Sequence, residues 1–341
     1  MKPADSTGSE TVAGLVSVVI CAYNNWPDLE LTVASALQQS YRPLEVIVVD
    51  NSSADETPQA LEKCFGGSVR YLHQPNRADS GAYNAGFDVA RGEFLQFMDG
   101  DDVLAPNKIE KQVEMFRANP ELDIVYGDIR MFQTLPGAAA WEDVTTQAET
   151  DILQALIVAG ERWTGISALG VLFHRRALER VGRWDESLYI SDLDYWVRAA
   201  WAGCRFGHCS GTLMGFARRR PNQMSGNTSA MARGVEVVWE KAMGYTTQDG
   251  YRRLLATTLA RWRLGMALSK DHTSRRDALA KLALARSTSP EIISAPVYVA
   301  ACAAIVLPAG TALLRSRWLR PIRRVLARML GLDFSMVGAK R

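Results

Sequence analysis

Three carboxylates stand within four residues at the end of an apolar run. Asp99, Asp101 and Asp102 follow the run 93–98, and Gly100 separates the first two. Carboxylates gathered in one place repel one another, and burial makes their charges costly. A divalent cation relieves that conflict, because carboxylate oxygens are suitable ligands for Mg²⁺ or Mn²⁺. The cluster therefore predicts a metal site, with a solvated acidic turn as the alternative that the motif alone leaves open.

Apolar, β-branched runs alternate with helical patterns before and after this cluster. The predicted strands are 15–20, 44–50, 69–72 and 93–98, and the predicted helices are 27–39, 57–64, 79–91 and 106–118. Asn25 is expected to cap the first helix. This alternation is typical of an α/β protein with a mostly parallel sheet flanked by helices. Ligands of such sheets bind at the carboxyl ends of the strands, where Asp50 and Asp99 both lie.

The later part of the chain changes character. Residues 122–126 and 129–134 predict two more strands, 136–150 predict a loop, and 184–204 are largely helical in pattern. From about residue 228 only alanine- and arginine-rich helical patterns remain. We therefore expect a catalytic domain over 15–227, with halves 15–125 and 126–227, and a helical region over 228–341. The polar residues 1–14 are expected to be disordered and to contain no signal peptide.

Charge is distributed unevenly along the 341 residues. The composition, 48% hydrophobic and 22% charged, is globular and sufficient for a large core. Residues 236–341 contain 18 Lys and Arg against 7 Asp and Glu, so residues 1–235 contain 21 against 30. A basic region beside an acidic body favours contact between the tail and an anionic surface.

The five cysteines show no dense disulfide framework, which favours a reducing compartment. Cys204, His208 and Cys209 lie close together in sequence, but their spacing matches no paired zinc pattern. They are expected to be ordinary core residues of a strand.

Four motifs in the order found here resemble the inverting family-2 glycosyltransferases of the GT-A fold, over roughly residues 15–225. They are Ser17–Asn24, Val48–Thr57, Asp99–Asp102 and Ile190–Arg198. The resemblance implies the fold of nucleotide-diphospho-sugar transferases. It also implies transfer of a single sugar, with inversion, from a nucleotide-diphosphate sugar to a hydroxyl of a glycan or glycolipid. Such a reaction would serve cell-envelope polysaccharide synthesis.

The resemblance also assigns roles to residues of the predicted cleft. It implies that the nucleotide sugar is bound by Ala22, Tyr23, Asn24, Asp50, Asn51, Asp79, Asn84, Asp99, Gly100 and Arg220. It implies that Asp101 and Asp102 hold Mn²⁺ or Mg²⁺, which stabilises the leaving nucleoside diphosphate. The Asp50 carboxylate can accept the imide hydrogen of uracil or thymine, so the donor is expected to be UDP- or dTDP-linked.

A sugar hydroxyl attacks well only as it loses its proton, and a positioned carboxylate can take that proton. Asp192 matches the family's catalytic base, while capping of the helix that it begins is the alternative. Asp194 and Trp196 are assigned to the acceptor site, with packing as their alternative.

Several positions depart from the family pattern. Asn51 stands where a second Asp is common, Tyr83 and Arg220 stand where relatives often have Arg and His, and Ser191 replaces a Glu. These departures leave open a non-catalytic nucleotide-sugar-binding or membrane scaffold protein. A nucleotidyltransferase is disfavoured, because 21–25 lack its glycine-rich loop. A processive synthase is disfavoured, because 258–262 lack the Gln of Gln-x-x-Arg-Trp.

The basic tail suggests a place for the protein in the cell. Residues 292–314 are uncharged but are interrupted by Pro296 and Pro308, and 315–330 alternate arginine with apolar residues at helical spacing. Such a helix is typical of a membrane interface rich in anionic lipid. We expect a cytoplasmic protein that associates peripherally with the inner face of the plasma membrane. No motif indicates nucleic-acid binding.

Overall fold

The computed structural model describes residues 10–132, 142–144, 151–158, 166–220, 223–268 and 274–306. The chain divides into two compact units. The α/β unit comprises Met1–Ile152 and Thr164–Gln223, and the helical unit comprises Leu153–Trp163 and Met224–Arg341. Residues 1–9 of the predicted disordered start lie outside the described residues, whereas Val12–Gly14 belong to the first strand, so the prediction is wrong for them.

The α/β unit is built on one mixed sheet with the strand order β3-β2-β1-β4-β8-β6-β9-β5, and β7 pairs with β6. The strands are β1 (Val12–Ala22), β2 (Leu44–Asp50), β3 (Arg70–His73), β4 (Gly92–Asp99), β5 (Val103–Leu104), β6 (Ile124–Phe132), β7 (Glu142–Val144), β8 (Leu172–His174) and β9 (Phe206–Arg218). The first four are parallel, as predicted. β8 runs antiparallel to both β4 and β6, so the second half of the sheet is mixed.

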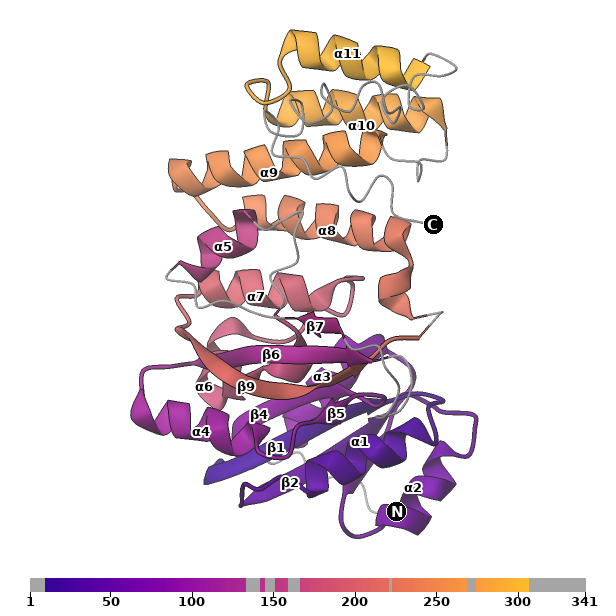
Figure 1. The fold of residues 1–341 in the computed structure, drawn as a ribbon, viewed down its shortest axis with the longest axis vertical. Coiled ribbons are helices and arrows are strands. Elements are labelled where there is room, and N and C mark those ends of the chain that lie inside the picture. Colours follow the sequence, from indigo (N-terminus) through magenta and orange to yellow (C-terminus); the bar gives the residue numbers. More distant parts are fainter. Residues whose placement is uncertain are drawn as a thin grey trace. The chain divides into compact units, whose positions relative to one another are not determined.

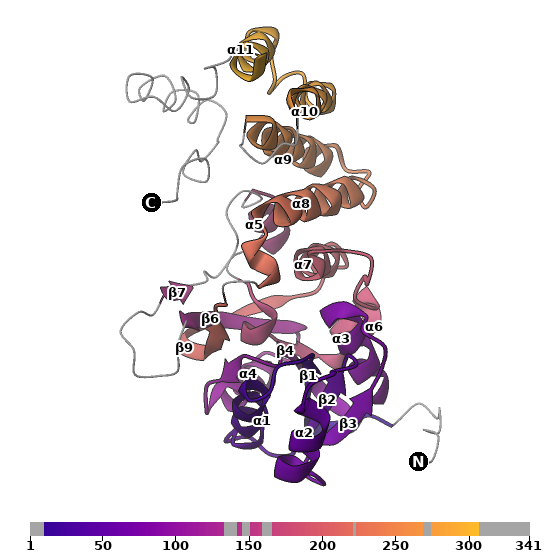
Figure 2. The ribbon, with the colours of Figure 1, turned by 90° about the vertical axis from the view of Figure 1, so that its right-hand side faces the viewer.

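Helices cover both faces of this sheet (Figure 2). Alternate residues of β1, such as Val18 and Ile20, share one core cluster with α1 (Asp28–Leu37) and α4 (Lys108–Ala118). On the opposite face a Cβ added to Gly86 of α3 (Ala78–Val89) would lie 2.2 Å from the Val19 side chain, so helix and strand approach closely there. The continuous apolar strands predicted from sequence are therefore buried on both faces, as parallel strands usually are.

Three predictions about the bounds and caps of elements are wrong. One strand, β6, replaces the two predicted around Gly127. Of the predicted helix over 184–204, only α7 (Ser191–Trp201) is helical, because 184–190 form turns. Pro27, not Asn25, is the cap of α1, and it makes no side-chain capping bond. The remaining short helices of the α/β unit are α2 (Thr57–Phe65), the 3₁₀ turn η2 (Ala168–Gly170) and α6 (Arg175–Val181). The short helix α5 (Ile152–Val158), apart from Ile152, and the 3₁₀ turn η3 (Met224–Gly226) belong to the helical unit.

The helical unit contains α8 (Thr228–Met243), α9 (Asp249–Leu268), α10 (Arg275–Thr288) and α11 (Ala295–Val306), which succeed one another in Figure 1. Small and branched apolar residues of α9, α10 and α11 form its core. Arg263 is buried and pairs with Glu236 and Glu240 of α8. The Thr258 hydroxyl donates to the Ile157 carbonyl at 3.1 Å and ties α5 to α9.

No helix within the described ranges has the length and apolarity needed to cross a membrane. The amphipathic segment 315–330 and residues 307–314 lie outside the described residues. All five cysteines are free. Cys209 is a buried residue of β9, as predicted, whereas Cys204 is buried but lies before that strand.

Candidate active site

The carboxyl ends of β1, β2 and β4 meet at one edge of the sheet. In the strand register, Ala22 pairs with Asp50 and Cys21 pairs with Asp99. Asp50 and Asp99, which the sequence predicted at strand ends, therefore lie at the ends of the two strands that flank β1. β9 runs parallel to β6, and its last residue, Arg218, reaches the same edge.

Asp50 is buried and is bound by its own chain. Its Oδ2 accepts from the Tyr71 hydroxyl at 2.6 Å, and its Oδ1 accepts from the Ser53 backbone N and hydroxyl at 2.9 and 2.6 Å. The Ser53 hydroxyl in turn accepts from the Asn24 backbone N, and the Asn24 side chain accepts from the Ala54 backbone N. Asp50 thus joins the two predicted nucleotide loops, and a direct contact of its carboxylate with a base is disfavoured by these bonds.

Asn51 and Asn84 are likewise engaged inside the protein. The Asn51 amide donates to the Ala78 carbonyl at 3.1 Å, and its oxygen accepts from Gln74 at 2.7 Å. The Asn84 side chain donates to the Trp184 carbonyl at 3.0 Å and accepts from the Trp184 backbone N at 2.9 Å. Both were predicted to contact the nucleotide sugar, but the structure gives them positioning roles, since their polar atoms are already paired.

The acidic cluster is the centre of the site. Asp99 is accessible to solvent, and its Oδ1 accepts from the Tyr83 hydroxyl at 2.7 Å. The pKa of Asp99 is raised well above its usual range, chiefly because the surrounding protein atoms exclude water from the carboxylate. The negative charges of Asp79 and Asp102 raise this pKa further. The pKa of Asp79 is also raised, chiefly by burial, and this carboxylate accepts from the Cys21 thiol at 3.5 Å.

Two arginines at the end of β9 offset part of this negative charge. Arg220 Nε lies 2.9 Å from Asp101 Oδ2, and the Arg218 backbone N donates to Asp102 Oδ1 at 2.9 Å. Both guanidinium groups also pair with Asp28, at 3.1 and 2.6 Å. The sequence did not predict a role for Asp28 in the site. An acid in the first turn of a helix is already stabilised by the helix dipole, so its position does not indicate a partner far along the chain.

The donor set of this edge fits a divalent cation. Mg²⁺ and Mn²⁺ prefer oxygen ligands, and Mg²⁺ is commonly held by one or two carboxylates together with substrate phosphates. Asp101 is partly accessible to solvent. Its carboxylate interacts electrostatically with those of Asp99 and Asp102, which lie close to it in the sequence. Within the described residues, no group of three or more carboxylate, imidazole or thiol side chains is arranged so that it could hold a metal ion. A cation at this edge would therefore need ligands beyond these side chains, such as the phosphate oxygens of a substrate.

Gly100 lies at a close approach of three segments. A Cβ at this position would lie 2.3 Å from the Asn25 amide nitrogen and 2.6 Å from the Cys21 carbonyl oxygen. We predict that Gly100→Ala displaces Asp99 and Asp101 and costs about 1–3 kcal/mol of stability. Urea unfolding measures the stability. Gly250→Ala is the matched control, because nothing lies within 4 Å of a Cβ there. Equal stability of the two variants would contradict the close approach.

Asp192 lies in the first turn of α7 and is half-buried. Its Oδ1 accepts from the Leu193 backbone N at 2.7 Å. Burial, with a smaller contribution from the Asp79 charge, raises the pKa of Asp192 to about 6. Asp79 therefore links Asp192 electrostatically to the acidic cluster. The cap residue of α7 is Ile190, so capping does not account for Asp192.

Asp194 and Trp196 are not available to an acceptor, and that prediction is wrong. Asp194 is buried and pairs with Arg198 at 2.7 Å. Trp196 is 1% exposed and stacks on Phe173 with ring centroids 5.7 Å apart. The packing alternative fits both, because the residues all round this part of α7, Leu193–Val197, are buried. Tyr195 stacks on Trp184 in the same aromatic cluster.

A salt-bridge network fixes the segment that leads into α7. Glu186 accepts from the Asn84 amide at 2.8 Å and pairs with Arg77, just before α3. Because Trp184 is held by Asn84, the turn between 184 and 190 is attached to α3 at two points. This attachment sets the position of the first turn of α7, where Asp192 lies. No single residue predicts such an attachment.

Proton and metal binding compete in this cluster, which gives a pH-dependent prediction. Burial and the charge of Asp101 raise the pKa of Asp102 to about 8. Below that pH the carboxyl is protonated, so a cation must displace the proton. We expect the Mn²⁺ affinity to rise between about pH 6 and about pH 8, by up to about tenfold per pH unit for each proton released. Titration followed by manganese electron paramagnetic resonance measures it, and Asp102→Asn is expected to flatten the profile. An equally steep profile in that variant would contradict the assignment.

Comparisons with known proteins agree on the fold. The chain superposes on the crystal structure of S. aureus TarS 1-349 in complex with UDP-GlcNAc with a TM-score of 0.61 and 16% identity, covering 91% of each chain. It superposes on the mannosyltransferase PcManGT from Pyrobaculum calidifontis, in complex with GDP-Man and Mn²⁺, with a TM-score of 0.55 and 20% identity, covering 96% of this chain and 88% of that one. The α/β unit has the GT-A fold of glycosyltransferases.

Sequence comparisons match part of the chain to one family. Residues 17–182 match the model of glycosyl transferase family 2. The chain is 28% identical over 178 residues to an uncharacterized glycosyltransferase of Nostoc, covering 49% of this chain and 52% of that protein. It is 30% identical over 203 residues to the succinoglycan biosynthesis protein ExoO of Rhizobium meliloti, covering 57% of each. The match to the family model covers just under half of the chain, and the chain spans about half the length of these curated relatives.

A further relative has a more specific name. The chain is 34% identical over 100 residues to the UDP-Glc:alpha-D-GlcNAc-diphosphoundecaprenol beta-1,3-glucosyltransferase WfaP of Escherichia coli, covering 29% of this chain and 40% of that protein. The matched part is short.

Proposed function

We propose that this protein is a metal-dependent, inverting glycosyltransferase that moves one sugar from a nucleotide-diphosphate sugar to a hydroxyl of a glycan or glycolipid. One observation carries the proposal: Asp99, Asp101 and Asp102 meet Arg218 and Arg220 at the carboxyl edge of the sheet. Carboxylates suit a cation, and adjacent guanidiniums suit phosphate oxygens. This combination fits a diphosphate that is bound together with a metal ion.

The loops after β1 and β2 would hold the nucleoside. Tyr23 is 51% exposed at the end of β1 and offers a ring on which a base can stack. Backbone groups of Ala22, Asn24 and Gly100 line the same edge, since the loops are fixed by Asp50 and Asn51. A UDP- or dTDP-linked donor is proposed, and the UDP-sugar in the names of WfaP and the TarS complex supports the first.

Asp101 would be the main ligand of Mn²⁺ or Mg²⁺, with Asp99 and Asp102 beside it. The cation would neutralise charge on the departing nucleoside diphosphate. Arg220 would bind the same phosphate oxygens, because its guanidinium already lies beside Asp101.

Asp192 would act as the general base. A carboxyl with a pKa of about 6 is ionised at neutral pH yet basic enough to accept a proton. It would remove the proton of the acceptor hydroxyl as that oxygen attacks the anomeric carbon. Attack from the face opposite the diphosphate inverts the configuration at that carbon.

We place the reaction in cell-envelope polysaccharide synthesis, at the inner face of the plasma membrane. The name of ExoO supports a polysaccharide product, and the excess of Lys and Arg in residues 236–341 supports contact with anionic lipid. The lipid-linked acceptor in the name of WfaP is consistent with this location.

The test is an assay of the full chain with a panel of nucleotide sugars, Mn²⁺ and glycan or lipid-linked acceptors. Release of nucleoside diphosphate reports turnover, and proton NMR of the product reports the anomeric configuration. We expect turnover that depends on the acceptor and gives an inverted product. Retention of configuration would contradict the mechanism. Nucleotide-sugar binding without turnover on any acceptor would support the scaffold alternative instead.

A further inference from the structure

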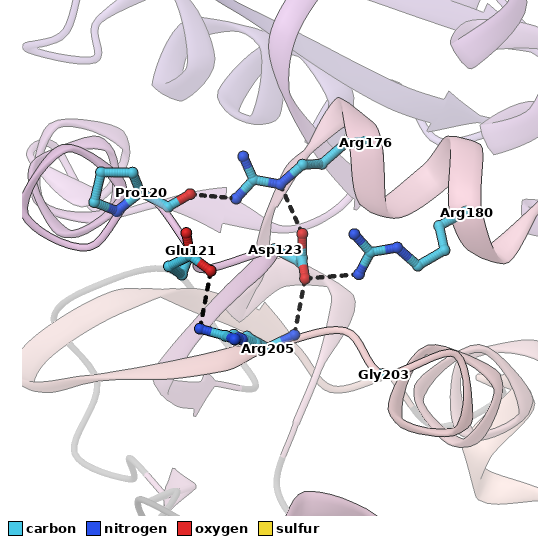
Figure 3. A pocket seen from close by; sticks show the side chains of 7 residues that line it. All are labelled: Pro120, Glu121, Asp123, Arg176, Arg180, Gly203 and Arg205. Carbon is cyan, nitrogen blue, oxygen red and sulfur yellow. Dashed lines mark hydrogen bonds and ion pairs between the residues drawn. The ribbon is translucent and has the colours of Figure 1, made fainter.

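A second cluster of charged side chains surrounds a pocket of about 410 Å³ in the α/β unit (Figure 3). Arg176 and Arg180 lie one turn apart on α6, and Arg205 lies directly before β9. Asp123, directly before β6, is at the centre, and Glu121 lies at one side. Nothing in the proposed reaction uses these residues.

The strand register separates this pocket from the candidate active site. β8 is antiparallel to β4, and its last residue, His174, pairs with Phe94 near the start of β4. Ile124, the first residue of β6, pairs with Phe173 and with Phe206 at the start of β9. The pocket therefore lies at the edge of the sheet opposite to Asp99, which ends β4.

Asp123 holds the guanidiniums of Arg176 and Arg180 and the backbone of Arg205. Its side chain is only 3% exposed and accepts from Arg176 Nε at 2.7 Å, Arg180 Nη1 at 3.0 Å and the Arg205 backbone N at 2.9 Å. Burial opposes its ionisation, but the hydrogen bonds from Arg176 and Arg205 and the charge of Arg180 bring its pKa below the usual value. Arg176 is further fixed by donating to the Pro120 carbonyl at 2.6 Å and to the Leu122 carbonyl.

Positive charge and donors remain after these contacts. The pocket has three guanidiniums and two carboxylates. In the Arg205–Glu121 ion pair both side chains are exposed, so the attraction between them is weak. Within the described part of the chain, only Nη1 of the Arg180 guanidinium and only Nη1 of the Arg205 guanidinium are paired. The Arg180 and Arg205 side chains are 42% and 64% exposed, so their other N–H groups are open to a ligand.

We propose that this pocket binds a phosphate group, at a site separate from that of the sugar donor. Guanidiniums reach the pocket from α6 on one side and from Arg205 on the other (Figure 3). A tetrahedral phosphate can accept from several such forks at once, whereas a planar carboxylate matches one. The guanidiniums that Asp123 holds lose little side-chain freedom when a ligand binds, which stabilises the bound phosphate further.

The test is a titration of the 341-residue chain with inorganic phosphate at low ionic strength, followed through the arginine Nε–H resonances and by calorimetry. We expect the Arg180 and Arg205 resonances to shift together. Arg180→Gln and Arg205→Gln should each weaken phosphate binding by about tenfold, the loss of one charge-assisted hydrogen bond. Arg205→Gln is the safer variant for folding, because its side chain does not touch Asp123.

Two control variants keep the result specific. Arg183→Gln removes an exposed arginine that pairs with Asp88 outside the pocket, and Arg220→Gln removes one from the candidate active site. Both should retain binding at this pocket. Equal phosphate affinity in Arg205→Gln and Arg183→Gln, or shifts confined to Arg218 and Arg220, would overturn the proposal and leave the cluster as an anchor for Asp123.

Further titrations define the source of the phosphate. Glycerol phosphate that binds at least as tightly as inorganic phosphate would assign the pocket to a phosphate ester. Weaker binding of the ester would assign it to the free ion. Acetate that competes equally well would overturn the preference for a tetrahedral anion.

Discussion

Replacing Asp192 with asparagine is expected to lower kcat by about 10²–10⁴-fold and to leave binding of the nucleotide sugar unchanged. Asparagine has nearly the same shape but cannot accept the proton of the acceptor hydroxyl. Because burial raises the pKa of Asp192 to about 6, the wild-type kcat should also fall as the pH drops through about 6. Steady-state kinetics over pH, together with calorimetry of donor binding, measure both effects.

The control for this variant is Asp88→Asn. Asp88 is exposed on α3 and pairs with Arg183, so its loss should change kcat little. An Asp192→Asn enzyme with the kcat of Asp88→Asn would show that another group removes the proton. A large loss of donor affinity in Asp192→Asn would instead indicate a structural role for this carboxylate at the start of α7.

Asp101→Asn is expected to lower kcat/KM by at least about 100-fold, because the cation and the diphosphate would lose their main carboxylate. Asparagine keeps the volume and removes the charge that also pairs with Arg220. Removal of Mn²⁺ from the wild-type protein with a chelator should produce a loss of similar size. The variant should lose little further activity on chelation.

Glu114→Gln is the matched control, since Glu114 is exposed and pairs with Lys111 of the same helix, α4. Kinetics with and without Mn²⁺ for both variants and the wild type make the comparison. Metal stimulation of Asp101→Asn equal to that of Glu114→Gln would contradict the role of Asp101.

The sequence predicted the parallel half of the sheet well, for a physical reason. β2 is found at the predicted residues, because a run such as Leu44–Asp50 is apolar, β-branched and ends in a polar loop. The second half was harder. β7 falls in a predicted loop, and Gly127 does not interrupt β6, because pairing with β8 and β9 decides those conformations.

The site was predicted in part, and the differences concern which atoms are free. The strand-end position of Asp50 was correct, but Tyr71 and Ser53 bind its carboxylate from two other segments. Residue type alone could not tell a ligand-binding carboxylate from one that fixes loops. Asp28 and Arg220, 192 residues apart, meet only through the fold. Trp196 was assigned to the acceptor site from the sequence, but its side chain is buried in α7.

The most direct test of the central claim is calorimetric titration of the 341-residue chain with UDP, in the presence and in the absence of Mn²⁺. If a cation at the carboxyl edge of the sheet grips the diphosphate, UDP should bind at least about tenfold more tightly with the metal. Equal affinities under the two conditions would contradict the account.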